Sequence, residues 1–439
     1  MAAMIPVKEF ADRRRRLMER MTPDSIAIVP AAPERVRNRD VLYPFRQDSD
    51  FQYLTGFGEP EAVLVLIPGR EHGESVLFCR ERNPEKELWD GFFAGQEGAI
   101  DTYGLDDAFP VGDIDDILPG MIEGRSRVYY PLGKDHEFDA RVMDWVKQIR
   151  SKVRAGAHPP GEFVALEHLL HDLRLYKSAA EIRVMAKAGQ ISSEAHKRAM
   201  QRARKGGFEY NLEAELIHTF MANGARSTAY PSIVGSGANG CILHYIENSA
   251  ALKDGDLVLI DAGCEYECYA SDITRTFPVN GRFSPEQKAI YEVVLAAQYA
   301  AIEAVHPDNH WDHPHQAALR VLTQGLIDLG LLSGTLEQAL EQQAYRPFFM
   351  HRTGHWLGMD VHDVGDYKVG DAWRQLEPGM ALTVEPGLYI APDNTDVDAR
   401  WRGIGIRIED DVVVTREGCR VLSEAAPKTI ADIEALMAD

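Results

Sequence analysis

The chain carries three histidines within one short run, His351-Arg352-Thr353-Gly354-His355-Trp356-Leu357-Gly358-Met359-Asp360-Val361-His362-Asp363. Two glycines lie between the first imidazole and the last. A segment that only filled a hydrophobic core would not need so many imidazoles, whereas a site that binds a metal and transfers protons near neutral pH would. A purely structural role for each histidine is the alternative, and acidic motifs elsewhere argue against it. The run therefore predicts a metal-dependent active site whose other ligands lie elsewhere in the sequence.

Two acids lie in neighbouring runs of β-forming residues. Asp261 ends the apolar run Leu257-Val258-Leu259-Ile260, and Asp272 follows among further β-formers. If the turn between them centres on Tyr266 and Glu267, the two carboxylates lie directly opposite each other, with Cβ atoms about 5 Å apart. Like charges so close repel, and burial increases the repulsion. A divalent cation between the two carboxylates would replace this repulsion with attraction to the metal. Solvated acids on a surface hairpin are the alternative, which fits poorly with the apolar residues around Asp261.

Two glutamates occupy the ends of later β-forming runs. Glu385 precedes Pro386-Gly387, and Glu409 ends a run from residue 403 in which apolar residues alternate with others. That alternation places Arg407 and Glu409 on one face of a strand. We expect Arg407 to orient a metal-ligating Glu409. A simple ion pair on the strand face is the alternative.

Together these residues offer four carboxylates and one imidazole, a donor set rich in hard oxygen ligands. Such a set favours Mn²⁺, with Co²⁺, Zn²⁺ and Fe²⁺ as alternatives, over a zinc site built on thiolates. Because several carboxylates can bridge, two metal ions about 3.5–4 Å apart are expected. Such a pair activates a bridging water and polarises a carbonyl group.

The composition indicates an ordinary globular protein of two domains. The chain has 439 residues, of which 45% are hydrophobic and 26% charged, and it exceeds what one hydrophobic core usually serves. Its formal net charge of −21 argues against nucleic acid or an anionic membrane as a partner, because phosphate binding needs a basic surface. The basic run from Arg13 to Arg16 is expected on the solvated face of a helix.

Neither a secretory signal nor a membrane span is expected. No apolar run follows the N-terminus, and no stretch of about 18 uncharged apolar residues is present. The five cysteines are odd in number and scattered, which is typical of reduced thiols. We therefore expect a cytoplasmic protein.

The first domain is expected to be a small α/β unit over residues 1–172. Its β-forming runs are separated by helical patterns, and a further helix is expected at 163–172. The predicted strands lie at 25–29, 62–67, 75–79 and 127–130.

The second domain is expected over residues 173–439. It begins with helices and returns to strands, which predicts an α+β arrangement in which helices cover an antiparallel sheet. Capping boxes mark helix starts at Ser178 with Glu181 and at Ser284 with Gln287, and Asn211 is expected to cap a third helix.

These motifs resemble one family. The five ligands in this order and spacing resemble the ligand set of the pita-bread metallopeptidases, and the run from His351 to Asp363 resembles the signature of proline-specific aminopeptidases and prolidases. The run Tyr43-Pro44-Phe45-Arg46-Gln47-Asp48-Ser49-Asp50-Phe51-Gln52-Tyr53-Leu54-Thr55-Gly56-Phe57 resembles the N-terminal domain of Xaa-Pro aminopeptidase, also called aminopeptidase P. The segments 240–245 and 385–390 match the same family.

The resemblance implies an enzyme that releases the N-terminal residue from peptides with proline in the second position. It implies that Glu385 also takes the proton from the attacking water, while His244 and His362 stabilise the oxyanion and orient the substrate carbonyl. The metal ligands that it implies are Asp261, Asp272, His355, Glu385 and Glu409.

The resemblance also implies residues around the substrate. His351 would line the proline pocket, and Tyr389 and Arg407 would lie behind the ligands, Arg407 in support of catalysis. Trp89 would cover the active site from a neighbouring subunit of a homodimer or homotetramer. An ordinary surface or core tryptophan is the alternative.

Two other functions fit part of this pattern. A prolidase uses the same metals but accepts only dipeptides. A pita-bread protein can also act as a metal-free hydrolase of small amidines or as a binding module. That version should lack the metal ligands, all five of which are present in this sequence.

Overall fold

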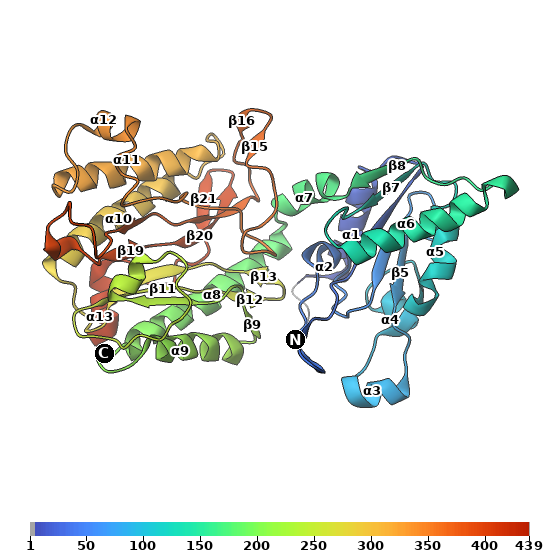
Figure 1. Cartoon of the computed structure of the whole chain (residues 1–439), viewed down its shortest axis with the longest axis horizontal. Coiled ribbons are helices and arrows are strands. Elements are labelled where there is room, and N and C mark those ends of the chain that lie inside the picture. The colour runs from blue at the N-terminus through green and yellow to red at the C-terminus, as the bar shows by residue number, and fades with distance from the viewer. Residues whose placement is uncertain (1–4, 439) are drawn as a thin grey trace. The chain divides into compact units, whose positions relative to one another are not determined.

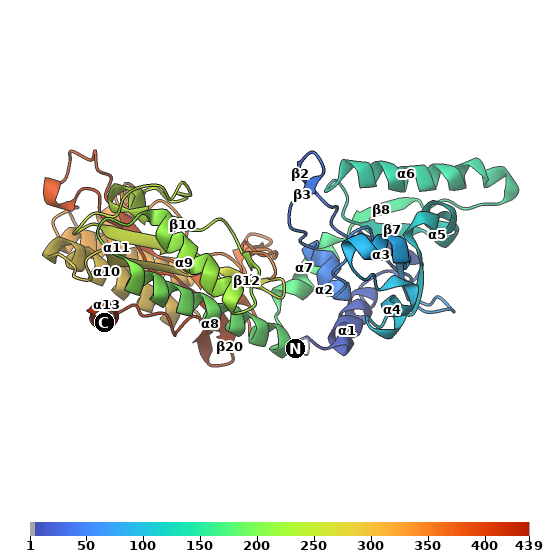
Figure 2. The ribbon, with the colours of Figure 1, turned by 90° about the horizontal axis from the view of Figure 1, so that it is seen from below.

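The computed structural model describes residues 5–438. It forms two compact units, with the boundary between Arg174 and Leu175. Figures 1 and 2 show the elements of each unit. Within residues 5–438, no helix is both long and apolar enough to cross a bilayer.

The N-terminal unit is built on a six-stranded mixed sheet in the order β6-β5-β4-β1-β7-β8. β1 (Ser25–Pro30) pairs in parallel with β7 (Arg127–Tyr130) and antiparallel with β4 (Val63–Leu66). These central strands are apolar runs because both faces of the sheet are buried. The other elements are α1 (Val7–Met18), β2 (Val36–Asn38), β3 (Val41–Leu42), α2 (Ser49–Thr55), β5 (Ser75–Cys79), α3 (Pro84–Asp90), α4 (Gly95–Asp101), β6 (Asp107–Pro110), α5 (Ile114–Ile122), α6 (His136–Ser151), β8 (Glu162–Ala165) and α7 (Glu167–Leu175).

The helix predicted at 163–172 begins later than expected. Phe163 belongs to β8, which pairs in parallel with β7, and the helix α7 starts only at Glu167. The short strand was missed because its few residues carry little periodicity of their own.

The prediction of a solvated basic face on α1 is wrong for two of its arginines. Arg13 is 0% exposed and Arg14 is 2% exposed. Their guanidinium groups donate to backbone carbonyls in the last turn of α2, Arg13 to Tyr53 O at 3.1 Å and Arg14 to Leu54 O at 2.9 Å. Cations are favoured at a helix C-terminus, so the two arginines attach α1 to α2 rather than face solvent.

The C-terminal unit is α+β, and every strand pair among its described residues is antiparallel. Two helix pairs, α8 (Ala179–Arg202) with α9 (Glu209–Ala222) and α10 (Pro285–Glu303) with α11 (Asp312–Asp328), flank the strands (Figure 1). The other elements are β9 (Ser227–Thr228), β10 (Ile233–Ser236), β11 (Leu257–Asp261), β12 (Cys264–Tyr266), β13 (Tyr269–Ala270), β14 (Thr274–Pro278), α12 (Leu336–Glu341), β15 (Lys368–Val369), β16 (Ala372–Trp373), β17 (Ala381–Val384), β18 (Gly387–Tyr389), β19 (Gly405–Arg407), β20 (Asp410–Thr415), β21 (Gly418–Val421) and α13 (Ile430–Ala438).

Two of the three predicted helix starts are confirmed. Ser178 and Ser284 both form capping boxes, at the starts of α8 and α10. The third helix, α9, begins at Glu209, earlier than predicted, so Asn211 caps it from within the first turn. There the Asn211 side chain accepts a hydrogen bond from the Phe208 N–H at 2.9 Å.

The hairpin that carries the two aspartates turns one residue later than predicted. Tyr266 pairs with Tyr269, so the turn is made by Glu267 and Cys268, both with positive φ of 48° and 65°. The strand partner of Asp261 is therefore Thr274 rather than Asp272. Asp272 lies in the irregular segment just before β14, which still brings it close to Asp261.

Candidate metal centre

Five chain segments bring the predicted ligands together. Ligand atoms of Asp272, His355 and Glu409 all lie within 4.8 Å of one another. His355 Nε2 is 3.3 Å from Asp272 Oδ2 and 3.8 Å from Glu385 Oε1. Asp261, at the end of β11, shares the Tyr230 hydroxyl with Asp272, at 2.6 Å and 2.5 Å respectively. All five predicted ligands therefore belong to one cluster.

A close backbone approach places His355 beside Glu385. The Glu385 N–H donates to Thr353 O at 2.8 Å, and the Thr383 N–H donates to His355 O at 3.0 Å. A Cβ on Gly354 would lie 2.1 Å from Thr383 O, so only glycine fits between the paired segments. Gly354 of the histidine-rich run is therefore explained by this close backbone approach.

The orientation of His355 suits a metal ligand. Its Nδ1 lies 2.9 Å from Trp356 O, an acceptor, so Nδ1 carries the proton. That leaves Nε2 directed at the carboxylates, which is the arrangement typical of metal-bound histidine. Burial disfavours the imidazolium, but the hydrogen bond and charge of Asp272 outweigh burial and raise the pKa of His355 to about 9.

The carboxylates of the cluster are crowded and poorly compensated. Burial, reinforced by Asp272, Glu385 and Asp261, raises the pKa of Glu409 well above its ordinary value. Burial likewise raises the pKa of Glu385 to about 7. Asp272 is the exception, because His355 holds its pKa low despite burial. Buried charges of one sign need a counter-charge, and a divalent cation supplies it. The donor set therefore fits a divalent metal.

Arg407 contacts a different acid from the one predicted. Its Nη2 donates to Asp261 Oδ2 at 2.6 Å, its Nη1 to the Tyr389 hydroxyl at 2.9 Å and its Nε to Thr274 Oγ1 at 3.1 Å. Within residues 5–438, its hydrogen-bond connection to Glu409 runs through Thr274, whose hydroxyl lies 2.6 Å from Glu409 Oε2. The shared strand face predicted for Arg407 and Glu409 does not produce a direct ion pair, because β19 ends at Arg407 before Glu409.

The other predicted histidines surround the cluster. The His362 ring lies 4.3 Å from that of His355 between centroids. His351 Nε2 lies 2.9 Å from the Tyr389 hydroxyl. Burial, with Arg407 second, lowers the pKa of His351 to about 3, so this imidazole is neutral. His244 is exposed and close enough for its charge to lower the pKa of both His351 and His362.

Trp89 belongs to the N-terminal unit, whereas the cluster belongs to the C-terminal unit. It lies in α3 of the N-terminal unit, and it is 86% exposed. The same short element exposes Leu88 and, just after it, Phe92.

Three contributors to the cluster were missed from the sequence. Tyr230 bridges the two aspartates from a loop after β9, and no local pattern marks it. Thr274 bonds Glu409 as described. Asp411 accepts the Asp272 backbone N–H at 3.1 Å on both carboxylate oxygens. The acidic triplet at 409–411, directly before the apolar run Val412-Val413-Val414, was a usable signal for Asp411, since charged residues are rarely buried without partners.

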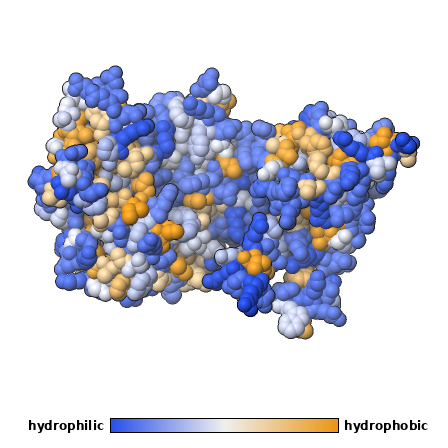
Figure 3. Space-filling view, viewed as in Figure 1, coloured by the Kyte–Doolittle hydropathy of each residue, from blue (hydrophilic) through white to orange (hydrophobic). Residues whose placement is uncertain are grey.

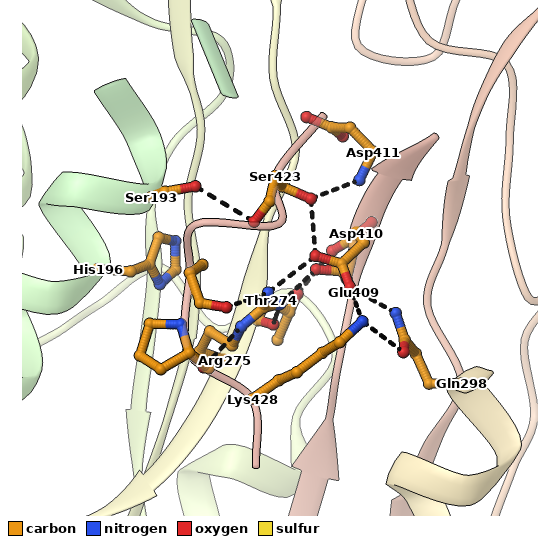
Figure 4. Close-up of polar contacts among 12 residues, drawn as sticks. Ser193, His196, Thr274, Arg275, Gln298, Glu409, Asp410, Asp411, Ser423 and Lys428 are labelled. Carbon is orange, nitrogen blue, oxygen red and sulfur yellow. Dashed lines mark hydrogen bonds and ion pairs between the residues drawn. The ribbon is translucent and has the colours of Figure 1, made fainter. Parts of the chain in front are cut away.

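A second charged cluster lies directly behind Glu409 (Figure 4). Arg275 is fully buried and donates to Glu409 O at 2.6 Å and to Asp410 Oδ1 at 2.8 Å. The Asp410 carboxylate also accepts from Ser423 at 2.7 Å and from Lys428 at 2.7 Å. This second cluster ties β14 and β20 together next to Glu409.

Comparison with known families identifies both units. A model of metallopeptidase family M24 matches residues 183–416, which is more than half of the chain. The chain belongs to metallopeptidase family M24. The aminopeptidase P N-terminal domain matches residues 10–129. The two-domain fold predicted from the sequence, with a pita-bread C-terminal domain, is confirmed, and the protein is a hydrolytic enzyme that uses a divalent metal.

Curated and structural relatives agree over nearly the whole length. The Xaa-Pro aminopeptidase of Escherichia coli K12 is 48% identical, over 98% of this chain and 97% of its own. The structure of Pseudomonas aeruginosa aminopeptidase PepP has a TM-score of 0.98 at 67% identity, covering 99% of this chain and 98% of that one. A zinc-substituted aminopeptidase P from E. coli in complex with product has a TM-score of 0.96 at 47% identity, covering 99% of each chain.

Proposed function

We propose that this M24 metallopeptidase is an Xaa-Pro aminopeptidase, which releases the N-terminal residue from peptides with proline in the second position. The observation that carries the proposal is the convergence of Asp272, His355 and Glu409 within 4.8 Å, in a chain of this family. Close similarity to a named Xaa-Pro aminopeptidase over nearly the full length supports the same substrate class.

Two divalent ions, with Mn²⁺ favoured over Co²⁺, Zn²⁺ and Fe²⁺, are the proposed cofactors. The oxygen-rich donor set supports this choice. Bound divalent ions supply Lewis acidity and lower the pKa of water. The residues proposed to hold them are Asp261, Asp272, His355, Glu385 and Glu409.

The remaining residues are proposed to handle substrate and protons. Glu385 accepts the proton of the attacking water. His362 and His244 donate hydrogen bonds to the oxygen on which negative charge develops. The amide before proline has no N–H, so the enzyme cannot position its substrate through that donor. Contacts to the carbonyl and to the free amine must do this work instead.

His351 and Tyr389 are proposed to line the proline pocket, with Arg407 behind them. Arg407 has only donors, so the Tyr389 oxygen accepts from it and the Tyr389 proton goes to His351 Nε2. His351 Nδ1 in turn donates to Arg352 O at 2.7 Å. The neutral ring is thereby fixed in one tautomer, and a neutral, rigid wall suits the apolar proline ring.

Residues 1–172 are proposed to form an accessory domain and residues 173–439 the catalytic one. The N-terminal unit exposes Leu88, Trp89 and Phe92 by 82%, 86% and 88%. Figure 3 shows pale and orange atoms at the tip formed by α3. Such a cluster suits an interface, and we propose that Trp89 covers the active site of another copy in a homodimer or homotetramer. The cytoplasm is the proposed compartment, since all five cysteines are free.

The decisive experiment measures hydrolysis of an Xaa-Pro-Yaa tripeptide by metal-stripped protein, with and without added Mn²⁺. We expect release of the first residue only when metal is present. Turnover of an Xaa-Pro dipeptide but not of the tripeptide would replace the proposal with a prolidase. If neither peptide were hydrolysed, a binding protein would be indicated.

A further inference from the structure

Thr274 occupies a position between two groups that the metal centre depends on. It is the first residue of β14 and is fully buried. Its hydroxyl oxygen lies 3.1 Å from Arg407 Nε and 2.6 Å from Glu409 Oε2. A guanidinium group has no acceptor, so the hydroxyl must accept from Arg407. Its single proton is then directed to Glu409.

Hydrogen bonds hold the main chains of Thr274 and Glu409 together, so the Glu409 carboxylate can move mainly by rotation of its side chain. The Glu409 N–H donates to Thr274 O at 3.1 Å. Arg275 Nη1 donates to Thr274 O at 2.9 Å and to Glu409 O at 2.6 Å, so one guanidinium holds both main chains (Figure 4). With both backbones held, the orientation of the Glu409 carboxylate depends on the groups that contact its oxygens.

Arg407 links this contact to a second metal ligand. Its Nη2 donates directly to Asp261 Oδ2, whereas its Nε acts on Glu409 through the Thr274 hydroxyl. One buried cation therefore orients two carboxylates from strands that are far apart in the sequence. Thr274 is the residue that connects Arg407 to Glu409, since the two side chains share its hydroxyl.

We propose that the Thr274 hydroxyl is a positioning residue of the metal centre, which holds the Glu409 carboxylate toward Asp272 and His355. The inference rests on the proposed metal site and assigns a residue that the ligand set alone does not include. Hydrogen bonds to ligating carboxylates fix their orientation, and the loss of such a partner typically weakens metal binding about 10–100-fold.

The same strand offers a matched control in Thr276. It is also fully buried and lies two residues along, on the same face of β14. Its hydroxyl donates to Arg407 O at 3.0 Å and accepts from the Arg407 backbone N–H at 3.3 Å, and within residues 5–438 it makes no hydrogen bond to a carboxylate of the proposed ligands. Thr276→Val therefore removes a buried hydroxyl of the same kind without removing the contact to Glu409.

The test titrates Mn²⁺ alone into the metal-stripped full-length protein by calorimetry, for wild type, Thr274→Val, Thr274→Ser and Thr276→Val. We expect Thr274→Val to bind about 10–100-fold more weakly, Thr274→Ser to restore wild-type affinity, and Thr276→Val to bind like wild type. Thermal unfolding without metal should shift similarly for the two valine variants, which separates positioning from packing.

Two results would overturn the inference while leaving the metal centre in place. One is Mn²⁺ affinity in Thr274→Val equal to that of wild type. The other is an equal loss in Thr274→Val and Thr276→Val, which would indicate a general packing effect. If the wild-type protein itself bound no Mn²⁺, the proposed metal centre would fail, and the role of Thr274 with it.

Discussion

Glu409 and Asp410 are neighbours in the chain, yet their carboxylates lie in opposite electrostatic surroundings. Asp410 accepts hydrogen bonds from Arg275, Ser423 and Lys428, and also from Gln298 at 2.6 Å. Burial works against its ionisation, but Arg275 and Lys428 outweigh burial and lower its pKa. Glu409 instead faces other acids, and burial together with those acids raises its pKa well above the ordinary value.

The difference shows how one acidic pair serves two purposes. Asp410 closes a compensated cluster that holds strands together, as an internal ion pair with full hydrogen bonding can do. Glu409 belongs to a cluster of four carboxylates that Arg407 and His355 compensate only in part. Uncompensated buried charge costs stability, so its presence marks a place where an external cation binds.

The largest effect is expected from removing Asp410. Asp410→Ala leaves the buried Arg275 and the largely buried Lys428 without their shared partner, and it should lower the free energy of unfolding by about 3–5 kcal/mol. Urea denaturation of the metal-free protein measures this. As a control, Arg400→Ala breaks a solvent-exposed contact with Asp398 and should change stability by less than about 0.5 kcal/mol. An Asp410→Ala protein as stable as wild type would mean that backbone carbonyls alone satisfy Arg275.

The next effect is the stabilisation that metal brings to the wild type. A ligand at about 100 times its dissociation constant adds roughly 2.7 kcal/mol to the folded state. Thermal scans with and without Mn²⁺ should therefore differ for wild type. In Glu409→Gln the metal-free protein should be at least as stable as wild type, because one repelling charge is gone, but Mn²⁺ should no longer raise its Tm. A normal metal-induced shift in Glu409→Gln would remove Glu409 from the ligand set.

The pH dependence of the metal-free protein should reflect the uncompensated cluster. Glu385 has its pKa raised to about 7, mainly by burial, and Asp272 raises that of His355 to about 9. Their unfolded values are about 4.3 and 6.5, so both groups bind protons more tightly in the folded chain. Their contribution is fully present below the unfolded pKa and is lost as pH rises through the folded one.

We therefore expect the free energy of unfolding without metal to fall by about 1–3 kcal/mol between roughly pH 5 and pH 9. Saturating Mn²⁺ should abolish this decline, because metal ions and protons compete for the same groups. Denaturant titrations at several pH values, each with and without metal, provide the comparison. A rise in metal-free stability across this range would contradict the proposed electrostatics.

The smallest effect is expected at Ser423, whose hydroxyl contacts both Asp410 and Asp411. Its hydroxyl donates to Asp410 Oδ1 at 2.7 Å and accepts from the Asp411 N–H at 3.1 Å. Ser423→Ala should cost about 1 kcal/mol of stability and leave Mn²⁺ affinity unchanged. Denaturation and calorimetry on the same variant measure both quantities. A loss of Mn²⁺ affinity would show that the two clusters are not independent.

The sequence indicated the proposed metal ligands more readily than the contacts that support them. Asp261, Glu385 and Glu409 are each an acid at the end of a β-forming run, and together they indicate a site more strongly than any one of them does. Nothing local identifies Tyr230 or Thr274, because an ordinary tyrosine or threonine gains its role only when distant strands pair.

The sequence also failed to predict the strand register at Asp261 and the burial of two arginines in α1. A turn made one residue later replaced Asp272 by Thr274 as the partner of Asp261, and turn position depends on backbone conformation at Glu267 and Cys268. Arg13 and Arg14 were predicted to be solvated, since a sequence pattern does not show that their guanidinium groups donate to backbone carbonyls of α2. The first error arises from the conformation of the turn and the second from long-range contacts, and periodicity encodes neither.

The spread of the ligands along the chain has a consequence for how the enzyme matures in the cell. The first proposed ligand is Asp261 and the last is Glu409, which lies beside β14 only after β20 has joined the fold. A ribosome that has not yet reached Glu409 carries a chain that lacks a complete site, and unfolded segments rarely preform one. With this proposed ligand set, metal loading would follow the synthesis of almost the whole polypeptide, and products terminated before Glu409 would remain inactive toward peptides in the cell.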